Sequence, residues 1–374
     1  MTIGFEAKRV FFNYSGLGNY SRNLIDALVR YFPGHKYLLY TPPGYQPGIF
    51  QPEKPAEIRF PEKWSEKKIP ALWRSLTLSK QVKRDNIDLF HGLSAELPGG
   101  IIKTGIPSIV TIHDLIFLRY PGLYPYVDRK IYQKKANTAC KNATRIIAIS
   151  EQTKDDITHF LNIDTEKIDI AYQSCHEQFF RITDNDTRLT VTEKYNLPST
   201  YILYVGTIEE RKNLLGLVKA IEMAKPGISL VVAGKPRKYA REVKKYIQTH
   251  RTGEVIFIES VDFRDLPALY QMASLFVYPS FFEGFGIPII EALVSGVPVI
   301  TSRDGCFAEA GGPGSRYVDP HSPESIAEAI KEIISDHALR NKMIQEGRQY
   351  VSRFSPHAAA SSIIDIYEKT VHGA

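Results

Sequence analysis

The stretch 275–301, LFVYPSFFEGFGIPIIEALVSGVPVIT, decides the fold. It opens and closes with short apolar runs, Leu275–Tyr278 and Val297–Thr301, which predict buried parallel strands. Between them lie a glycine-rich loop and a segment long enough for one helix, with Pro288 in its first turn and Gly296 just past its end. Strand, loop, helix and strand in this order form the repeating unit of a doubly wound α/β sheet.

The same rhythm runs outward in both directions. Further short β-branched runs predict strands at 3–5, 109–112, 145–149, 201–205, 229–233 and 255–258, and helix-length segments separate most of them. A helix is predicted over 126–141, and Ser150 is predicted to cap the next one. The rhythm lapses in the polar stretch 172–200. We therefore predict two Rossmann-like, doubly wound parallel-sheet domains, 1–180 and 190–355, which face a central cleft.

Length and composition agree with this division. A chain of 374 residues with 43% hydrophobic and 24% charged residues is typical of a two-domain globular protein. The three cysteines are far apart and predict reduced thiols rather than disulfides or a zinc site. The sequence shows no apolar leader and no run of about 18 apolar residues. A cytoplasmic location is therefore predicted.

The net charge of +6 is unevenly distributed. Residues 1–180 carry 24 Lys and Arg against 18 Asp and Glu, whereas the remaining residues carry 23 of each. Two segments of the basic half, 64–84 and 120–135, interleave cations with aromatic residues. They predict either a peripheral contact with an anionic membrane or ordinary helix surfaces with solvated lysines. Nucleic acid is not expected as a partner, because no known binding motif accompanies the charge.

The loop after the strand 275–278 carries the strongest chemical signal. Glu283, Gly284, Phe285 and Gly286 precede the start of a helix, and Glu291 follows about one turn into it. Backbone N–H groups at a helix start favour oxygen-rich or anionic ligands, and glycines let such a ligand approach closely. The two carboxylates can therefore serve separate parts of one ligand, although a charged turn with a surface glutamate is the plainer alternative.

A second candidate follows the strand 201–205. Gly206 ends that strand, and Arg211 and Lys212 precede the next helix. A guanidinium offers a planar fork to phosphate oxygens and an ammonium offers a compact charge, so the pair suits a diphosphate. A dibasic solvated loop is the alternative.

Two weaker candidates lie in the first half. Gly16 and Gly18 stand between the first strand and an amphipathic helix pattern, where backbone amides are able to meet a phosphate, although a lone Gly-x-Gly is weak evidence. His113 follows the strand 109–112 and is suited to hydrogen-bond a ligand or to move a proton. A histidine that merely caps the strand end is an equal alternative.

Together these motifs resemble those of the retaining glycosyltransferases of family 4, which have the GT-B fold. The segments EGFGIPIIEA at 283–292 and VG…RKN at 205–213, the glycine loop at 16–18 and His-Asp-Leu at 113–115 occur in family order. The resemblance implies that Glu283 contacts the donor sugar, Glu291 holds the ribose, and Lys212 and Arg211 neutralise the leaving nucleoside diphosphate. It also implies that helix 356–374 packs back on the first domain. Thr207 departs from the family, in which an arginine often stands after the strand-end glycine.

The resemblance implies transfer of a sugar from a nucleoside-diphosphate sugar to a hydroxyl of a glycan or lipid-linked acceptor. GDP-mannose is the first donor hypothesis, in the assembly of a surface polysaccharide. No metal or cofactor is expected, because no His, Asp or Glu cluster has ligand spacing, and Asp184-Asn-Asp186 is interpreted as a solvated turn of the connection. A non-catalytic nucleotide-sugar or polysaccharide-binding protein is the main alternative. An NAD-dependent oxidoreductase is a weaker one, because neither GxGxxG nor its partner acidic residue appears cleanly in the sequence.

Overall fold

The computed structural model describes residues 1–45 and 48–373, so positions 46, 47 and 374 of the predicted domain ranges lie outside the described residues. The chain forms two compact units, Met1–Ser174 with Pro356–Ala374, and Cys175–Ser355. The first unit ends six residues before the predicted limit of 180. The reason is that Phe179, on the 3-10 helix η5 (Glu177–Phe180), is buried against Tyr270 of the second unit, with ring centroids 5.8 Å apart.

The first unit is built on a seven-stranded parallel sheet with the strand order β3-β2-β1-β4-β5-β6-β7. The runs predicted from sequence form β1, β5 and β6, and most side chains of the central strands are buried on both faces, as expected of parallel strands covered by helices. The strands are β1 (Thr2–Glu6), β2 (Lys36–Tyr40), β3 (Ala56–Arg59), β4 (Leu89–Gly92), β5 (Ser108–Ile112), β6 (Arg145–Ala148) and β7 (Ile168–Ile170).

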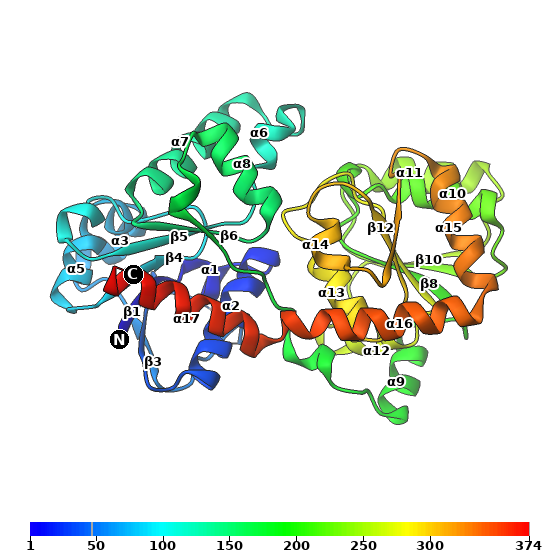
Figure 1. Cartoon of the computed structure of the whole chain (residues 1–374), viewed down its shortest axis with the longest axis horizontal. Helices are drawn as coiled ribbons and strands as arrows, with labels where there is room; N and C mark the ends of the chain where they lie inside the picture. Colours follow the sequence, from blue (N-terminus) through cyan, green and yellow to red (C-terminus); the bar gives the residue numbers. More distant parts are fainter. Residues whose placement is uncertain (46–47, 374) are drawn as a thin grey trace. The chain divides into compact units, whose positions relative to one another are not determined.

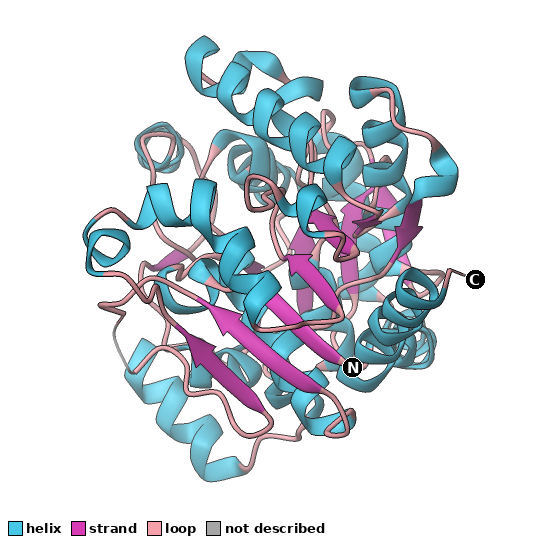
Figure 2. Cartoon of the chain, turned by 90° about the vertical axis from the view of Figure 1, so that its left-hand side faces the viewer, coloured by secondary structure: helices cyan, strands magenta, loops and turns pink. Residues whose placement is uncertain are grey.

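Helices flank this sheet (Figure 2). They include the predicted helix α7 and the helix capped by Ser150, whose side chain accepts a hydrogen bond from the Thr153 N–H. The helical segments are α1 (Lys8–Phe12), α2 (Gly16–Tyr31), α3 (Trp64–Lys68), α4 (Pro70–Leu72), the π-helix η1 (Trp73–Thr77), α5 (Leu78–Arg84), η2 (Ile101–Thr104), α6 (Ile116–Arg119), η3 (Pro121–Leu123), α7 (Tyr126–Asn142), α8 (Glu151–Leu161), η4 (Thr165–Lys167) and α17 (Pro356–His372).

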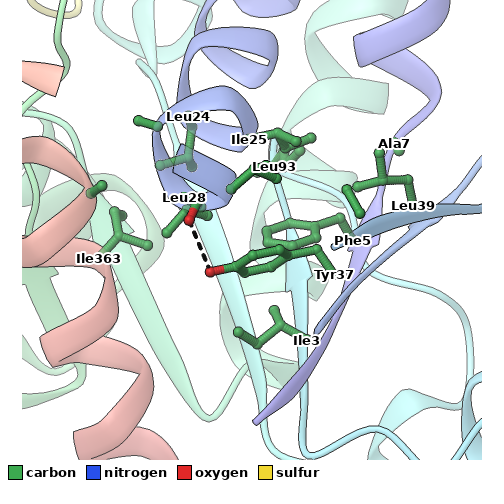
Figure 3. Packing of buried hydrophobic residues seen from close by; sticks show 14 of the residues in the cluster. Ile3, Phe5, Ala7, Leu24, Ile25, Leu28, Tyr37, Leu39, Leu93 and Ile363 are labelled. Carbon is green, nitrogen blue, oxygen red and sulfur yellow. Dashed lines mark hydrogen bonds between the residues drawn. The ribbon is translucent and has the colours of Figure 1, made fainter. Parts of the chain in front are cut away.

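The C-terminal helix α17 packs beside α2 within the first unit (Figure 1). Its apolar face joins the main core there, where Ile363 packs near Leu24 and Leu28 of α2, and the Tyr37 hydroxyl donates to the Leu28 carbonyl at 3.1 Å (Figure 3). A buried polar chain adds to this packing, because His91 on β4 bonds the Tyr367 hydroxyl at 2.7 Å.

The second unit has a six-stranded parallel sheet with the order β10-β9-β8-β11-β12-β13. Strand β12 begins at Val299, two residues later than predicted, because Pro298 has no N–H to give to the ladder. The last strand, β13, is an edge strand that the sequence analysis did not predict. The strands are β8 (Tyr201–Val205), β9 (Ser229–Ala233), β10 (Val255–Ile258), β11 (Leu275–Tyr278), β12 (Val299–Ser302) and β13 (Ser315–Val318).

The interpretation of Asp184-Asn-Asp186 as a linker turn is wrong. Asp184 is the N-cap of α9, since its carboxylate accepts from the Thr187 N–H at 2.7 Å, and α9 belongs to the second unit. The other helical segments of this unit are α9 (Asn185–Tyr195), η6 (Glu210–Lys212), α10 (Leu214–Ala224), α11 (Ala240–Thr249), η7 (Phe263–Asp265), α12 (Leu266–Gln271), α13 (Ile287–Val294), α14 (Phe307–Gly311), α15 (Pro323–Ser335), α16 (His337–Val351) and η8 (Ser352–Phe354).

When the strands of each unit are counted from its own start, the second sheet has the order 3-2-1-4-5-6 of the doubly wound Rossmann fold, and the first sheet has the same order with a seventh strand added at its end. The prediction of two such units is therefore confirmed. In this order the progression of successive strands across the sheet reverses between the first and fourth strands. Ligands bind beyond the carboxyl ends of those two strands. In the second unit these strands are β8 and β11.

Candidate functional site

The carboxyl end of β8 leads into the dibasic motif. Gly206 has φ +152°, and a side chain there would meet Lys212 at 3.2 Å, so a glycine lets the lysine fold back over the strand end. Lys212 closes the 3-10 helix η6, and Asn213 follows in the left-handed region. The Asn213 amide donates to the carbonyls of Pro279 at 3.2 Å and Pro320 at 2.6 Å, which fixes the turn from η6 into α10.

The loop after β11 brings Glu283 to the same place. One carboxylate oxygen, Oε2, lies 2.6 Å from Nη1 of Arg211, and the other, Oε1, lies 3.4 Å from Nζ of Lys212. Arg211 also donates to the Phe282 carbonyl at 2.5 Å and pairs with Glu209 at 2.7 Å. The structure thus gathers the predicted residues Glu283, Lys212, Arg211 and Gly206 at the point where the strand order reverses.

These charges determine the ionisation of Glu283. Burial alone raises the pKa of a carboxyl group, but the charges of Lys212 and Arg211 and the hydroxyl of Tyr278 hold the pKa of Glu283 down at about 2. Its side chain is only 13% exposed, as is that of Lys212. The site therefore holds a permanent carboxylate beside two cations in a water-poor environment, where electrostatic interactions are strong.

Tyr278 is a site residue that the sequence analysis missed. It ends β11 and is buried, and its hydroxyl lies between Lys212 Nζ at 2.8 Å and Glu283 Oε1 at 2.7 Å. In the sequence it reads only as the last aromatic residue of a strand. Its position could have identified it. A polar group at the carboxyl end of a strand next to the reversal of strand order faces the edge of the sheet where ligands bind.

The predicted glycine-rich loop does lead into a helix. Gly286 is the N-cap of α13, with φ +116°, and Pro288 occupies the first turn as predicted. The side chain of Phe285 is buried and packs on Phe354, with ring centroids 5.5 Å apart, so its ring is not available to a ligand. Beneath the loop, the Cys306 thiol donates to the carbonyls of Glu283 at 3.3 Å and Phe285 at 3.0 Å.

Glu291 lies on α13 and accepts a hydrogen bond from the Tyr270 hydroxyl at 2.9 Å. Burial raises the pKa of Glu291 to about 7, although the Tyr270 hydroxyl and the charge of Lys212 oppose the rise. The two glutamates of the motif thus differ in character, because Glu283 is a permanent anion and Glu291 titrates near neutrality.

Gly16 and Gly18 lie in the first unit and form the first turn of α2 rather than a free loop. The Gly18 N–H is used by the helix, since it donates to the Ser15 carbonyl at 2.9 Å. A side chain at Gly18 would stand 1.9 Å from the Asn13 carbonyl oxygen, which explains the glycine structurally. Around Gly16 there is open space, so Gly16 is the better candidate for a ligand contact.

His113 stands just beyond the end of β5, as predicted, but both of its ring nitrogens are engaged. Nε2 bonds the Leu93 carbonyl at 2.9 Å, and the Gln173 amide bonds Nδ1 at 3.0 Å. The ring also lies edge-on to Tyr20, with centroids 4.6 Å apart. Burial lowers the pKa of His113 to about 4, so the imidazole is neutral near pH 7. This environment favours a fixed, neutral ring over a proton carrier.

Across residues 1–45 and 48–373, no group of three or more His, Cys, Asp or Glu side chains is arranged to hold a metal ion. All three cysteines lie in the described part of the chain, are buried, and form no disulfide bond.

Comparisons with known proteins place most of the chain in described families. Residues 14–174 match the family model "Glycosyltransferase Family 4", and residues 189–350 match "Glycosyl transferases group 1". The chain is 28% identical over 287 residues to O-antigen chain mannosyltransferase B of Escherichia coli, covering 75% of this chain and 74% of the relative. It is 30% identical over 225 residues to O-antigen chain mannosyltransferase RfbU of Salmonella typhimurium, covering 60% of each protein.

The fold has close counterparts among solved structures. A glycosyltransferase from Rickettsia africae superposes with a TM-score of 0.79 at 19% identity, over 100% of this chain and 99% of the other. Together with the two parallel-sheet units, this likeness confirms the predicted GT-B fold.

Proposed function

Because the chain belongs to the glycosyltransferases described by these two family models, we propose that it transfers mannose from GDP-mannose to a hydroxyl of a glycan or lipid-linked acceptor during surface polysaccharide assembly. The mannosyl group is supported by the two O-antigen mannosyltransferase relatives. The guanine nucleotide, the retention of configuration at the sugar carbon and the independence from metal ions rest on the resemblance of the motifs.

One observation carries the proposal: Lys212, Arg211 and Glu283 share one buried site where the strand order reverses. In the proposed reaction the acceptor oxygen bonds to the sugar carbon, and the bond from that carbon to the phosphate oxygen breaks. The diphosphate leaves with the electron pair, and its departing oxygen takes up the proton of the acceptor hydroxyl. Lys212 and Arg211 stabilise the charge that grows on the diphosphate. Glu283 orients the sugar through its hydroxyls, Glu291 accepts from the ribose, and the amides near Gly284 and Gly286 add further donors.

The charged groups of the site pair with one another. Glu283 is bonded by Arg211 on one oxygen and by Tyr278 on the other. A bound diphosphate offers the two cations new anionic partners, which frees lone pairs of Glu283 for sugar hydroxyls. Donor binding is thus an exchange of partners within the site, and no charge is left unpaired.

The test is a panel of nucleotide sugars, incubated with the protein and with acceptor extracts, with nucleoside diphosphate release and product linkage as readouts. We expect GDP release from GDP-mannose, an α-configured product from the α-configured donor, and the same rate in EDTA. Thermal shifts with each nucleoside diphosphate rank the bases, since a ligand of the native state raises the melting temperature. Donor binding without turnover on any acceptor would instead favour a non-catalytic binding protein.

Donor affinity is expected to depend on Glu291 and on pH. The pKa of Glu291 is about 7, and Tyr270 on α12 and the charge of Lys212 face it. A carboxylate accepts ribose hydroxyl donors better than a neutral acid, so the affinity for GDP should fall as the pH drops from about 8 to 6. Calorimetry of the wild type and of Glu291→Gln separates this effect from the ionisation of the phosphates. Equal pH slopes for the two proteins would contradict the assignment.

We also propose that the first unit rests on an anionic membrane. Among the described residues, fourteen of the nineteen exposed large apolar side chains lie in this unit, including Leu72 and Leu76 near η1 and Tyr126, Val127 and Ile131 on α7. Trp73 belongs to one of the two segments predicted to contact a membrane, but its side chain is buried in the core and cannot do so. No helix in the described parts of the chain has both the length and the apolar character to span a bilayer.

Two features support an anionic partner. Segments 64–84 and 120–135 hold ten cations and two carboxylates, an excess larger than that of the whole chain. They are also neighbours, because Arg74 of η1 and Lys135 of α7 both pair with Glu96. Exposed apolar side chains among cations are typical of surfaces that insert shallowly into anionic membranes.

The membrane prediction is tested by co-sedimentation with phosphatidylcholine vesicles with and without phosphatidylglycerol. Lys130 and Lys134 lie one turn apart on α7 and are exposed. The double change Lys130→Glu/Lys134→Glu should weaken binding to anionic vesicles by at least about tenfold. Arg241→Glu/Lys245→Glu on α11 has the same spacing and charge change and should bind as the wild type does. If both double variants lost vesicle binding equally, the loss would be explained by net charge alone and not by a membrane-binding surface on α7.

A further inference from the structure

The Tyr278 side chain is held rigidly by its neighbours. Its ring stacks on that of Phe276, with centroids 5.9 Å apart and planes 16° apart. The Lys212 ammonium lies over the same ring at 5.1 Å from the centroid, in addition to its hydrogen bond to the hydroxyl. The side chain is 1% exposed. The position of its oxygen is therefore determined by packing and not by solvent.

The hydroxyl of Tyr278 connects the two charges of the site. It accepts a hydrogen bond from Lys212 Nζ at 2.8 Å and donates to Glu283 Oε1 at 2.7 Å. The charged atoms themselves stand 3.4 Å apart, which is longer than a direct charge-assisted hydrogen bond. Without the hydroxyl, attraction in this buried site favours closure of the lysine onto the carboxylate, since Coulomb forces are strong at low dielectric.

We propose that Tyr278 is a positioning residue of the transfer reaction, whose hydroxyl keeps the Lys212 ammonium and the Glu283 carboxylate at the separation at which one meets the diphosphate and the other the sugar. The proposal rests on the proposed function of this site. Tyr278 touches neither reacting atom and acts only through Lys212 and Glu283. The contribution of Tyr278 to catalysis grows as charge develops on the diphosphate. A misplaced Lys212 ammonium raises the free energy of the transition state more than that of the bound donor.

The test compares Tyr278→Phe with the wild type in steady-state transfer from GDP-mannose. The phenylalanine keeps the ring and its packing and removes one oxygen. Hydrogen bonds from a neutral hydroxyl to charged groups contribute enough that kcat should fall about ten- to a hundredfold, while the KM for the donor changes little. Tyr201→Phe is the matched control, because Tyr201 is buried on the adjacent strand β8 and its hydroxyl donates to the Leu269 carbonyl at 2.7 Å, away from the site.

Tyr201→Phe should keep the wild-type kcat and lose at most thermal stability. A wild-type kcat for Tyr278→Phe overturns the proposal, and so does an equal loss in both variants, which would reduce the effect to folding. A rise in KM without a change in kcat also overturns it, because it would place Tyr278 in ground-state binding. Failure of the proposed function is recognised separately, since then the wild type itself releases no nucleoside diphosphate from any nucleotide sugar.

Discussion

Lys212→Ala is expected to lower kcat for transfer from GDP-mannose by about 10²- to 10³-fold, the loss that follows removal of one preorganised charge donor. The Lys212 ammonium is 13% exposed and stands at the carboxyl edge of the second sheet between β8 and β11. Among the described residues that contact Glu283, Lys212 is the only lysine. No second ammonium group can therefore replace it beside the departing diphosphate.

The fold should survive this change. Glu283 keeps the Arg211 guanidinium at 2.6 Å and the Tyr278 hydroxyl at 2.7 Å, so no buried carboxylate is left unpaired. Lys219→Ala is the control, because Lys219 lies on α10 with its ammonium over the Tyr246 ring. The measurement is the initial rate of GDP release at saturating donor, together with a melting curve. An unchanged kcat in Lys212→Ala would remove this lysine from the mechanism.

Glu283→Gln should lower transfer by about 10²-fold or more, since the sugar loses a charged hydrogen-bond acceptor and the two cations lose their common anion. Glutamine is preferable to alanine because its amide keeps the shape of the side chain and still accepts from Tyr278. Loss of a buried ion-pair partner also costs free energy of folding, up to about 3–5 kcal/mol, so stability must be measured alongside activity.

Glu209→Gln is the matched control for Glu283→Gln. Glu209 is the other carboxylate of Arg211, at 2.7 Å, but its side chain is 36% exposed. The control should change both activity and stability only slightly, because exposed ion pairs contribute little. If Glu283→Gln kept near-normal transfer while folded, Glu283 would not be the sugar contact.

The sequence predicted several strands that are buried on both faces, but it missed β2 and β4, whose side chains are mostly buried as well. Runs such as Tyr201–Val205 and Ser229–Ala233 are continuous, apolar and bounded by polar residues, so their strand character does not depend on tertiary context. The edge strand Ser315–Val318 carries polar residues, so it lacks a continuous apolar run and was not predicted. The polar stretch around Asp184 was mistaken for a linker because a short, weakly amphipathic helix on the surface leaves little hydrophobic pattern.

The sequence predicted those site residues that belong to recognisable motifs. Glycines and charged residues in loops, such as Gly206, Lys212 and Glu283, show their chemistry in the sequence because loops have few structural reasons to hold them. Tyr278 was missed because an aromatic residue at a strand end is ordinary, and only the fold places its hydroxyl between two charges. His113 shows the opposite case. The motif suggested a reactive ring, but the contacts to Leu93 and Gln173 that occupy both nitrogens are invisible in the sequence.

The central claim is that one buried pair of opposite charges receives the donor, with the phosphates at the ammonium and the sugar at the carboxylate. A crystal structure of the protein with GDP-mannose tests it most directly. We predict phosphate oxygens within about 3 Å of Lys212 Nζ and mannose hydroxyls at similar distances from the Glu283 carboxylate. A donor bound elsewhere, with Lys212 and Glu283 still joined only to each other, to Tyr278 and to Arg211, would contradict the account.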